Sequence, residues 1–324
     1  MGEAFAGKTV GKKAMLWGIL AHSIPDIDVI AATWLSPTQD LIAHRGFTHS
    51  ILFVLLFSPV FAYFANRWHK PHNISFIKWV SFFLVVIGFH IFIDAFNNYG
   101  TGWFEPFSHY RVAINAVYVV DPLFSIWSVM ALVILLITLK GNKLRSLSWK
   151  LGLGITCMYL FYCTMNKIII DRSFKNELKR NHIPYNSYFT TPAPLQNWLW
   201  FVVAGDTKGF YVGYKSVFFP AKNDQLTYFP KNENLLDDYK DDDDIKNLKR
   251  FSQGYYTASF YTDTLVFSDL RFGQEAGWYN PNGKFAFHYY LKENTDNSIV
   301  VQRGRFAKWD WNATKAFWQK IKGK

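Results

Sequence analysis

The stretch "ILFVLLFSPVFAYF", residues 51–64, contains no charged side chain and decides how the first half of the chain is read. A membrane-spanning α-helix needs about 20 mainly apolar residues, and this stretch with its flanks approaches that length. Apolar segments of this kind run over about residues 14–24, 47–66, 79–97, 119–139 and 151–170. The first is short, and Pro25 is expected to end or bend it. We therefore predict an α-helical polytopic membrane domain of four or five apolar helices over residues 1–172.

The composition changes after Arg172, because residues 173–324 are polar, aromatic and turn-rich, with no run long enough to span a bilayer. β-type composition with partial alternation occurs in "KGFYVGYKSVFF", "TDTLVFSDLRF", "KFAFHYYLKE" and "SIVVQRGRF". The closing stretch "DWNATKAFWQKIKGK" predicts an amphipathic helix capped by Asp310. The acidic stretch "DYKDDDDIK", residues 238–246, is interpreted as a solvated loop. We predict a soluble, mostly β or α+β domain over residues 173–324.

The distribution of charge predicts an orientation for the apolar helices. Lys and Arg exceed Asp and Glu by 11, and the excess in the first half is concentrated in alternate links between the apolar segments. The basic links carry Lys8, Lys12 and Lys13, then Arg67, Lys70 and Lys78, then Lys140, Lys143, Arg145 and Lys150. By the positive-inside rule these links are cytoplasmic, so the poor links, 25–46 and 98–120, face outward together with the C-terminal domain. No nucleic-acid-binding motif is present, so the lipid bilayer is the partner that the basic charge indicates.

Seven metal-capable side chains fall at the same predicted membrane face. The orientation was drawn from Lys and Arg alone, yet it gathers acidic and histidine residues from four separate links and helix ends. These residues are Asp26, Asp28, His44, His49, His90, Asp94 and Asp121. Because His90 and Asp94 are four residues apart, they project from one helix face. This convergence predicts a functional site.

The residue types in this set favour a metal centre. Imidazoles mixed with carboxylates suit Zn, Mn, Fe or Mg, and three or more carboxylates could hold two ions that polarise an oxyanion and activate water. Asp94 is an ionisable residue inside an apolar run, where function is the default expectation. Singly, most members have a structural alternative: Asp121 before Pro122 could be an N-cap, Asp26 after Pro25 a turn, and His90 an ordinary helix histidine. As a set they predict metal binding.

Two arginines are candidates for binding an anion near this site. Arg45 lies between the two histidines of "AHRGFTHS", residues 43–50, and its planar fork suits a phosphate. Arg111, in "EPFSHYR", is the second candidate. The alternative for each is an interfacial arginine that extends its head to the membrane surface.

Several motifs in this order resemble the YdjM-like family of predicted membrane-bound, metal-dependent hydrolases, over about residues 3–125. They are "GKKAMLWGILAHSIPDID", "HRGFTHS", "HIFIDAFNNYGTGWFEPFS" and "DPLF". The family's P-D-x-D, H-R-G-x-T-H-S, H-x-x-x-D and D-P elements fall on Asp26 and Asp28, on His44 to Ser50, on His90 and Asp94, and on Asp121-Pro122. The family usually has a small residue where His22 stands. The resemblance implies a bacterial inner-membrane hydrolase, and the family description also mentions a LexA-type partner.

The leading hypothesis is a membrane-embedded metal-dependent hydrolase in which a metal-activated water attacks an ester, for which a lipid or lipid-linked phosphoester fits the location. Asp26, Asp28, His44, His49, His90 and Asp94 would hold one or two divalent ions, with zinc favoured over Mn or Mg. Asp26, Arg45 and Asp121 are the candidate catalytic residues, and Arg45 and Arg111 would bind an anionic substrate. The alternative is a non-catalytic membrane binding or regulatory protein with a structural metal. A haem protein is disfavoured, because aspartates interleave with the histidines and no C-x-x-C-H motif is present.

Overall fold

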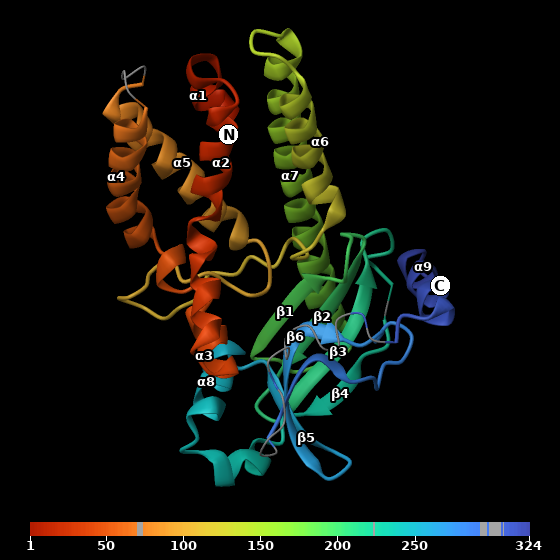
Figure 1. Ribbon diagram of the computed structural model, residues 1–324. Helices are drawn as coiled ribbons and strands as arrows, with labels where there is room; N and C mark the ends of the chain where they lie inside the picture. Colours follow the sequence, from red (N-terminus) through yellow and green to blue (C-terminus); the bar gives the residue numbers. More distant parts are fainter. Residues whose placement is uncertain (70–73, 223, 292–296, 298–305, 307) are drawn as a thin grey trace. The chain divides into compact units, whose positions relative to one another are not determined.

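The computed structural model describes residues 1–69, 74–222, 224–291, 297, 306 and 308–324, which form two compact units (Figure 1). The first unit consists of Met1–Trp34, Ala43–Ile114 and Val120–Tyr162, and the second of Leu35–Ile42, Asn115–Val119 and Cys163–Lys324. The division falls inside one long helix, α7 (Lys143–Arg180), which also contains the predicted boundary after residue 172.

Apolar helices build the first unit. Their bounds are α1 (Gly2–Val10), α2 (Lys13–Ser23), η1 (Pro25–Thr33), η2 (Phe47–His49), α4 (Ile51–Trp68), α5 (Phe76–Asp94), α6 (Pro122–Ile137) and the first half of α7. Within the described residues, α4, α5 and α7 are long and apolar enough to cross a membrane, and α2 with η1 makes a fourth span if the bent pair counts as one. The prediction of an apolar helical domain is confirmed.

Two of the predicted apolar segments differ from a simple span. The segment at 14–24 forms α2, and a bend of 57° separates it from η1 at Pro25, as expected for a proline that interrupts a helix. The segment at 119–139 forms α6, whose 16 residues fall short of the about 20 needed to cross a bilayer. Asp121 caps this helix by accepting from the backbone N–H groups of Leu123 and Phe124 at 2.8 and 3.3 Å.

The α4–α5 pair forms the centre of the first unit. Ser50 and Ser75 start these helices as N-caps, since each hydroxyl accepts from a backbone N–H three residues later. α5 buries one aromatic stripe, including Trp79, Phe82 and Phe83, against α2 and α4. The same face ends in His90, so the packing that fixes α5 also fixes its last turn.

Two antiparallel sheets build the second unit. The first has the order β1 (Ser187–Pro192), β2 (Leu199–Gly205), β3 (Gly209–Ser216) and β4 (Thr227–Pro230), and the second has the order β5 (Tyr256–Tyr261), β6 (Thr264–Gln274) and β7 (Phe285–Tyr290). The remaining elements are α3 (Pro37–Ala43, its last residue in the first unit), η3 (Glu233–Tyr239), α8 (Asp243–Phe251) and α9 (Trp311–Ile321). The membrane domain is thus followed by antiparallel sheets, as predicted.

Strand β2 is buried on both faces and joins two cores. Trp200 and Val202 pack against Phe174 of the second half of α7, whereas Phe201 and Val203 belong to a core shared with β6, β7 and α9. Successive side chains of a strand point to opposite faces, so one strand serves both layers. The sheet β1–β4 therefore lies between a helix and a second sheet.

Most of the predictions for the second unit hold. Three β-type stretches form β3, β6 and β7, and the closing helix is α9 with Asp310 accepting from Ala313 N at 2.7 Å. The fourth stretch, "SIVVQRGRF", lies outside the described residues except for Phe306. The acidic stretch is not a loop: it spans the end of η3, a turn and the start of α8, where Asp242 accepts from the N–H groups of Asp244 and Ile245. Acidic residues at a helix N-terminus are stabilised there.

Candidate metal centre

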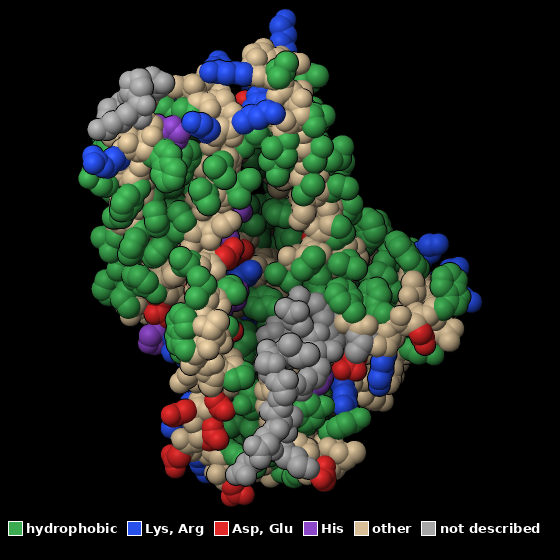
Figure 2. All heavy atoms as spheres, in the orientation of Figure 1, with side chains coloured by type: hydrophobic (Ala, Val, Ile, Leu, Met, Phe, Trp, Pro, Cys, Tyr) green, Lys and Arg blue, Asp and Glu red, His purple; other side chains and the backbone are tan. Residues whose placement is uncertain are grey.

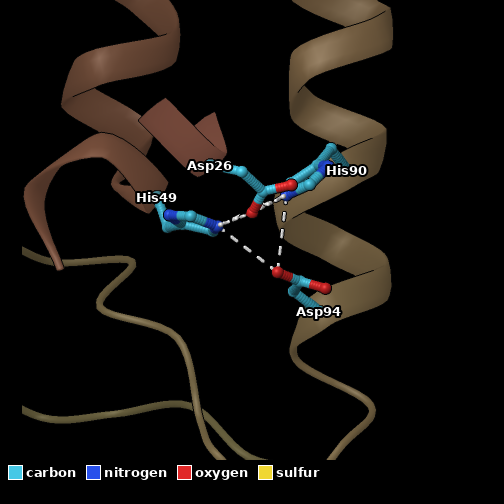
Figure 3. Close-up of side chains that lie close together, drawn as sticks. All are labelled: Asp26, His49, His90 and Asp94. Atoms are coloured by element: carbon cyan, nitrogen blue, oxygen red, sulfur yellow. Dashed lines mark hydrogen bonds and ion pairs between the residues drawn. The ribbon is translucent and has the colours of Figure 1, made fainter. Parts of the chain in front are cut away.

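Three elements of the first unit, η1, η2 and α5, bring the candidate ligands together. Asp26 follows the Pro25 bend at the start of η1, and His49 ends η2 just before α4 begins. His90 and Asp94 lie one turn apart in the last turns of α5. In Figure 3 the four side chains point toward one another from these elements. The four residues, defined here as the four-residue centre, are Asp26, His49, His90 and Asp94.

Five of the six separations between the ligand atoms of this centre are close to the edges of a tetrahedron, and all four atoms lie within 4.8 Å of one another. The Nε2 atoms of His49 and His90 are 3.3 Å apart. Each of them lies 3.5 Å from Asp26 Oδ1 and 3.3 or 3.4 Å from Asp94 Oδ2. A tetrahedral zinc ion with bonds of about 2.0–2.1 Å separates its ligand atoms by about 3.3–3.4 Å. The spacing therefore fits one small divalent cation.

Hydrogen bonding alone gives a poor account of this spacing. Typical N–H···O bonds are about 2.9–3.0 Å long, which is shorter than all four nitrogen–oxygen separations. Asp94 Oδ2 is buried and accepts no hydrogen bond from any described residue. A buried carboxylate oxygen without a hydrogen-bond donor is costly unless positive charge compensates it, and here the Arg45 guanidinium, with its Nε 3.3 Å away, supplies part of that charge. The residues present thus fit a divalent ion.

The charge around His49 also favours a bound cation. Its side chain is fully buried, and burial by itself opposes a charge on the imidazole. Asp26, Asp28 and Asp94 nevertheless surround it and raise its pKa to about 10. The field at this position therefore favours positive charge strongly enough to outweigh desolvation.

Asp28 and His44 lie behind the centre rather than in it. Asp28 Oδ2 accepts from the backbone N–H of Arg45 and from the Thr48 hydroxyl, both at 2.8 Å, and lies 3.3 Å from His49 Nδ1. His44 Nδ1 is 3.0 Å from the other oxygen of Asp28. A carboxylate on Nδ1 directs the opposite nitrogen, Nε2, toward the centre. Of the six residues predicted as ligands, the structure brings four together and sets these two beside them.

The guanidinium of Arg45 reaches the edge of the centre. Its Nε is 3.3 Å from Asp94 Oδ2, and the group stacks over the ring of Tyr99, 5.1 Å from the ring centroid. Arg45 is only 9% exposed, and its Nε and Nη1 donate no hydrogen bond to any described residue. Its backbone has a positive φ of 59°, which is uncommon for a residue other than glycine. The chain thus holds an arginine with unused donors beside the centre.

Arg111 and Asp121 have partners away from the centre. Arg111 Nη2 donates to the carbonyl of His44 at 2.8 Å, so it ties the 98–120 link to the "HRGFTHS" turn. Asp121, besides capping α6, accepts from the Tyr159 hydroxyl at 2.8 Å. Neither residue is a member of the four-residue centre. Their observed contacts are those of residues that position the surrounding segments.

The sequence did not single out two neighbours of the centre, His22 and Thr48, as parts of the site. The ring of His22 lies 4.7 Å from that of His90, centroid to centroid, and at nearly a right angle to it. The Thr48 hydroxyl contacts both Asp28 and His49 Nδ1. A spacing of four residues between His22 and Asp26 could have marked His22, but the helix break at Pro25 removes the usual meaning of that spacing.

A family model described as YdjM inner membrane protein matches residues 1–170, which include all four residues of the centre and more than half of the chain. The chain belongs to the YdjM family. The uncharacterized protein YfhP of Bacillus subtilis (strain 168) is 25% identical over 269 residues, covering 80% of this chain and 77% of YfhP. Inner membrane protein YbcI of Escherichia coli (strain K12) is 26% identical over 113 residues, covering 34% of this chain and 64% of YbcI. No solved structure is significantly similar to the chain. Family membership agrees with the resemblance, and with the apolar helices it makes this chain a membrane protein.

Proposed function

We propose that the chain is a membrane-embedded, metal-dependent hydrolase whose four-residue centre binds one divalent ion, with zinc favoured. The observation that carries the proposal is the near-tetrahedral spacing of two imidazole nitrogens and two carboxylate oxygens. Nitrogen ligands favour zinc over Mg or Mn, which prefer oxygen. A bound zinc ion supplies Lewis acidity and lowers the pKa of water.

The surrounding residues would orient the ligands, accept a proton and bind the substrate. Asp28 and Thr48 hold the His49 ring by Nδ1, and His44 supports Asp28. The side chain of Asp26 is 45% exposed, whereas those of the other three ligands are at most 15% exposed. Asp26 would therefore be the carboxylate free to accept a proton from water, while the other three residues would hold the ion. Arg45 would bind the anionic group of the substrate through its unused Nη1 donor.

The proposed substrate is an anionic ester, in particular a lipid or lipid-linked phosphoester. The centre lies at the ends of apolar helices, where an amphiphile would present its polar group. The basic links support, by the positive-inside rule, an extracytoplasmic position for this face of the bacterial inner membrane. Residues 173–324 would then form an extracytoplasmic domain.

A second candidate function also has a specific observation in its favour. Structural zinc sites are closed by four protein ligands, whereas catalytic sites usually keep three and an open position. The four-residue centre has four, which fits a non-catalytic membrane protein with a structural metal. The exposure of Asp26 separates the two functions, because only a catalytic centre would tolerate the loss of this ligand from the ion.

The experiment is elemental mass spectrometry on the detergent-purified full chain, with Asp26→Asn compared with His49→Ala. A catalytic centre predicts about one zinc per chain in the wild type, retention in Asp26→Asn with loss of phosphoester hydrolysis, and loss of zinc in His49→Ala. His109→Ala is the matched control, since its exposed ring contacts only Glu105 among the described contacts. Loss of zinc from Asp26→Asn would favour the structural metal, and a wild type without metal after incubation with Zn and Mn would refute the centre.

A further inference from the structure

An elongated apolar cavity of about 440 Å³ lies among helices of the first unit. α1, α2, α5, α6 and α7 all contribute to its wall, which is mainly apolar and includes Met15, Val86 and Leu132. This volume lies within the range of small-molecule sites, about 300–1,000 Å³. The lining residues of α6 run from Phe124 to Leu135, which corresponds to about 17 Å of helix. The cavity therefore has the length and lining expected for a hydrocarbon chain.

One end of the cavity adjoins the four-residue centre. His22 and Ser23 line this end together with Ile93 of the last turn of α5. The His22 ring is 4.7 Å from the ring of His90, which is a member of the centre. Figure 2 shows a hollow among hydrophobic side chains, with histidine at its lower margin and acidic and basic side chains below it. The apolar cavity thus leads to the polar four-residue centre.

The cavity also has an apolar rim from which a lipid could enter. Ile19 of α2 and Val129 of α6 line it and are 49% and 55% exposed. The adjacent side chains Leu20 and Val133 are exposed and apolar as well. In a membrane protein such a surface faces lipid rather than water, so the opening leads to the hydrocarbon phase.

The charge beyond the polar end of the cavity favours an anionic head group. Arg45 is 91% buried and keeps Nε and Nη1 free of hydrogen bonds to described residues, next to Asp94. A buried guanidinium with an unused Nη1 donor is complementary to a phosphate, whose anionic oxygens accept charge-assisted hydrogen bonds. A neutral lipid would leave this donor unpaired.

We propose that the cavity binds a hydrocarbon chain of a phosphate-bearing lipid, with its phosphate at the centre beside Arg45. This assignment rests on the proposed function, which already names a lipid phosphoester, and deepens it by placing the hydrocarbon chain of that substrate in a specific subsite. The binding step itself needs no turnover, so it can be tested apart from hydrolysis.

The test is photo-crosslinking of the detergent-purified full chain with phosphatidic acid that carries a diazirine in one acyl chain. We expect labelled peptides from the cavity-lining residues of α2 and α6. Leu132→Trp fills the cavity and should reduce this labelling by at least about tenfold, as for the loss of room for more than one methylene. Val133→Trp is the matched control, because Val133 is the next residue of α6 but does not line the cavity. If Leu132→Trp does not fold, Ile19→Trp with Leu20→Trp as control replaces the pair.

The head group is tested with diacylglycerol that carries the same diazirine chain. Arg45→Gln should lower labelling by the phosphatidic acid and leave labelling by diacylglycerol unchanged. Excess inorganic phosphate should compete far less than unlabelled phosphatidic acid, because it cannot fill the cavity. Equal labelling of Leu132→Trp and Val133→Trp, or labelling spread over the whole apolar surface, would overturn the inference.

Zinc is measured on the same preparations, so that the two proposals can fail separately. Zinc retained without cavity labelling would refute the chain-binding subsite alone. Cavity labelling in a chain that binds no zinc would refute the proposed function and leave the lipid site standing.

Discussion

Each unit of the molecule buries a cluster of charged side chains, and the two clusters differ in how well they satisfy one another. In the second unit, Lys215 donates to Glu177 at 2.5 Å, to Asp224 at 3.2 Å and to the carbonyl of Lys222 at 3.0 Å. All three protons of the ammonium therefore have acceptors. In the first unit, the contacts of the four-residue centre are 3.3–3.5 Å long, and donors of Arg45 and an oxygen of Asp94 have no hydrogen-bond partner among the described residues.

This difference separates two reasons for burying charge. A cluster that closes on itself, like that of Lys215, stabilises one arrangement of α7 and β3. A cluster that converges on a point and keeps unused donors and acceptors is organised around a ligand. The comparison predicts that the Lys215 cluster matters for stability and the four-residue centre for binding.

The largest expected effect is the loss of metal when one imidazole of the centre is removed. His90→Ala should lower the zinc content from about one ion per chain to below about one tenth, because a tetrahedral site loses a direct ligand. The matched variant is His22→Ala, whose ring neighbours that of His90 but is outside the centre. Elemental mass spectrometry before and after chelation and reloading measures both variants. Equal loss of zinc from His22→Ala would show that the centre is larger than four residues.

The second effect is on stability, and it should be confined to the cluster of the second unit. Lys215→Met leaves Glu177, which is fully buried, without its counter-ion, so the free energy of unfolding should fall by about 3–5 kcal/mol. Zinc content per folded chain should not change. Proteolysis of the detergent-solubilised chain across a urea series measures the loss, with the exposed Lys208→Met as control. A fall of less than about 1 kcal/mol would mean that the closed cluster is not a stabilising one.

The third effect separates direct ligands from the residues behind them. Asp28→Asn keeps the shape of the side chain but weakens its interaction with His49 Nδ1, and such changes typically lower metal affinity by about 10–100-fold without abolishing binding. Competition with a zinc-binding dye measures the affinity. Complete loss of zinc would make Asp28 a ligand, as the sequence predicts. An unchanged affinity would instead remove its proposed orienting role.

The sequence predicted the position of the centre better than its composition. Alternating basic links brought Asp26, His49, His90 and Asp94 to one face, and helical spacing put His90 and Asp94 on one side of α5. Whether Asp28 and His44 are ligands or lie behind the ligands depends on which nitrogen of the His49 ring faces the centre. That choice follows from the turn at Arg45, where φ is 59°, and from contacts between residues far apart in sequence. Spacing alone contains neither fact.

A similar limit applies to the fold. Composition separated apolar helices from antiparallel strands because hydrophobic length and alternation are local signals. It could not show that residues 35–42 and 115–119 belong to the second unit. Thr38, for example, donates to Asp244 of α8, 206 positions away in sequence, and only the folded chain reveals such a pair.

The smallest expected effect comes from Glu233, whose charge is paired at the surface. It tests whether burial is the reason that the Lys215 cluster contributes to the free energy of unfolding. Glu233 accepts from Tyr256 and pairs with Lys231 and Lys249, and these contacts lower its pKa from 4.5 to about 2, although its side chain is 52% exposed. A depressed pKa adds stability that is present above pH 4.5 and is lost as the pH falls toward 2. Solvent screening should keep the loss in Glu233→Gln below about 1 kcal/mol at pH 7. The same urea series at pH 7 and at low pH measures it, and the two chains should converge as the pH approaches 2. A loss at pH 7 as large as that of Lys215→Met would show that pairing alone, without burial, accounts for the stability of both clusters.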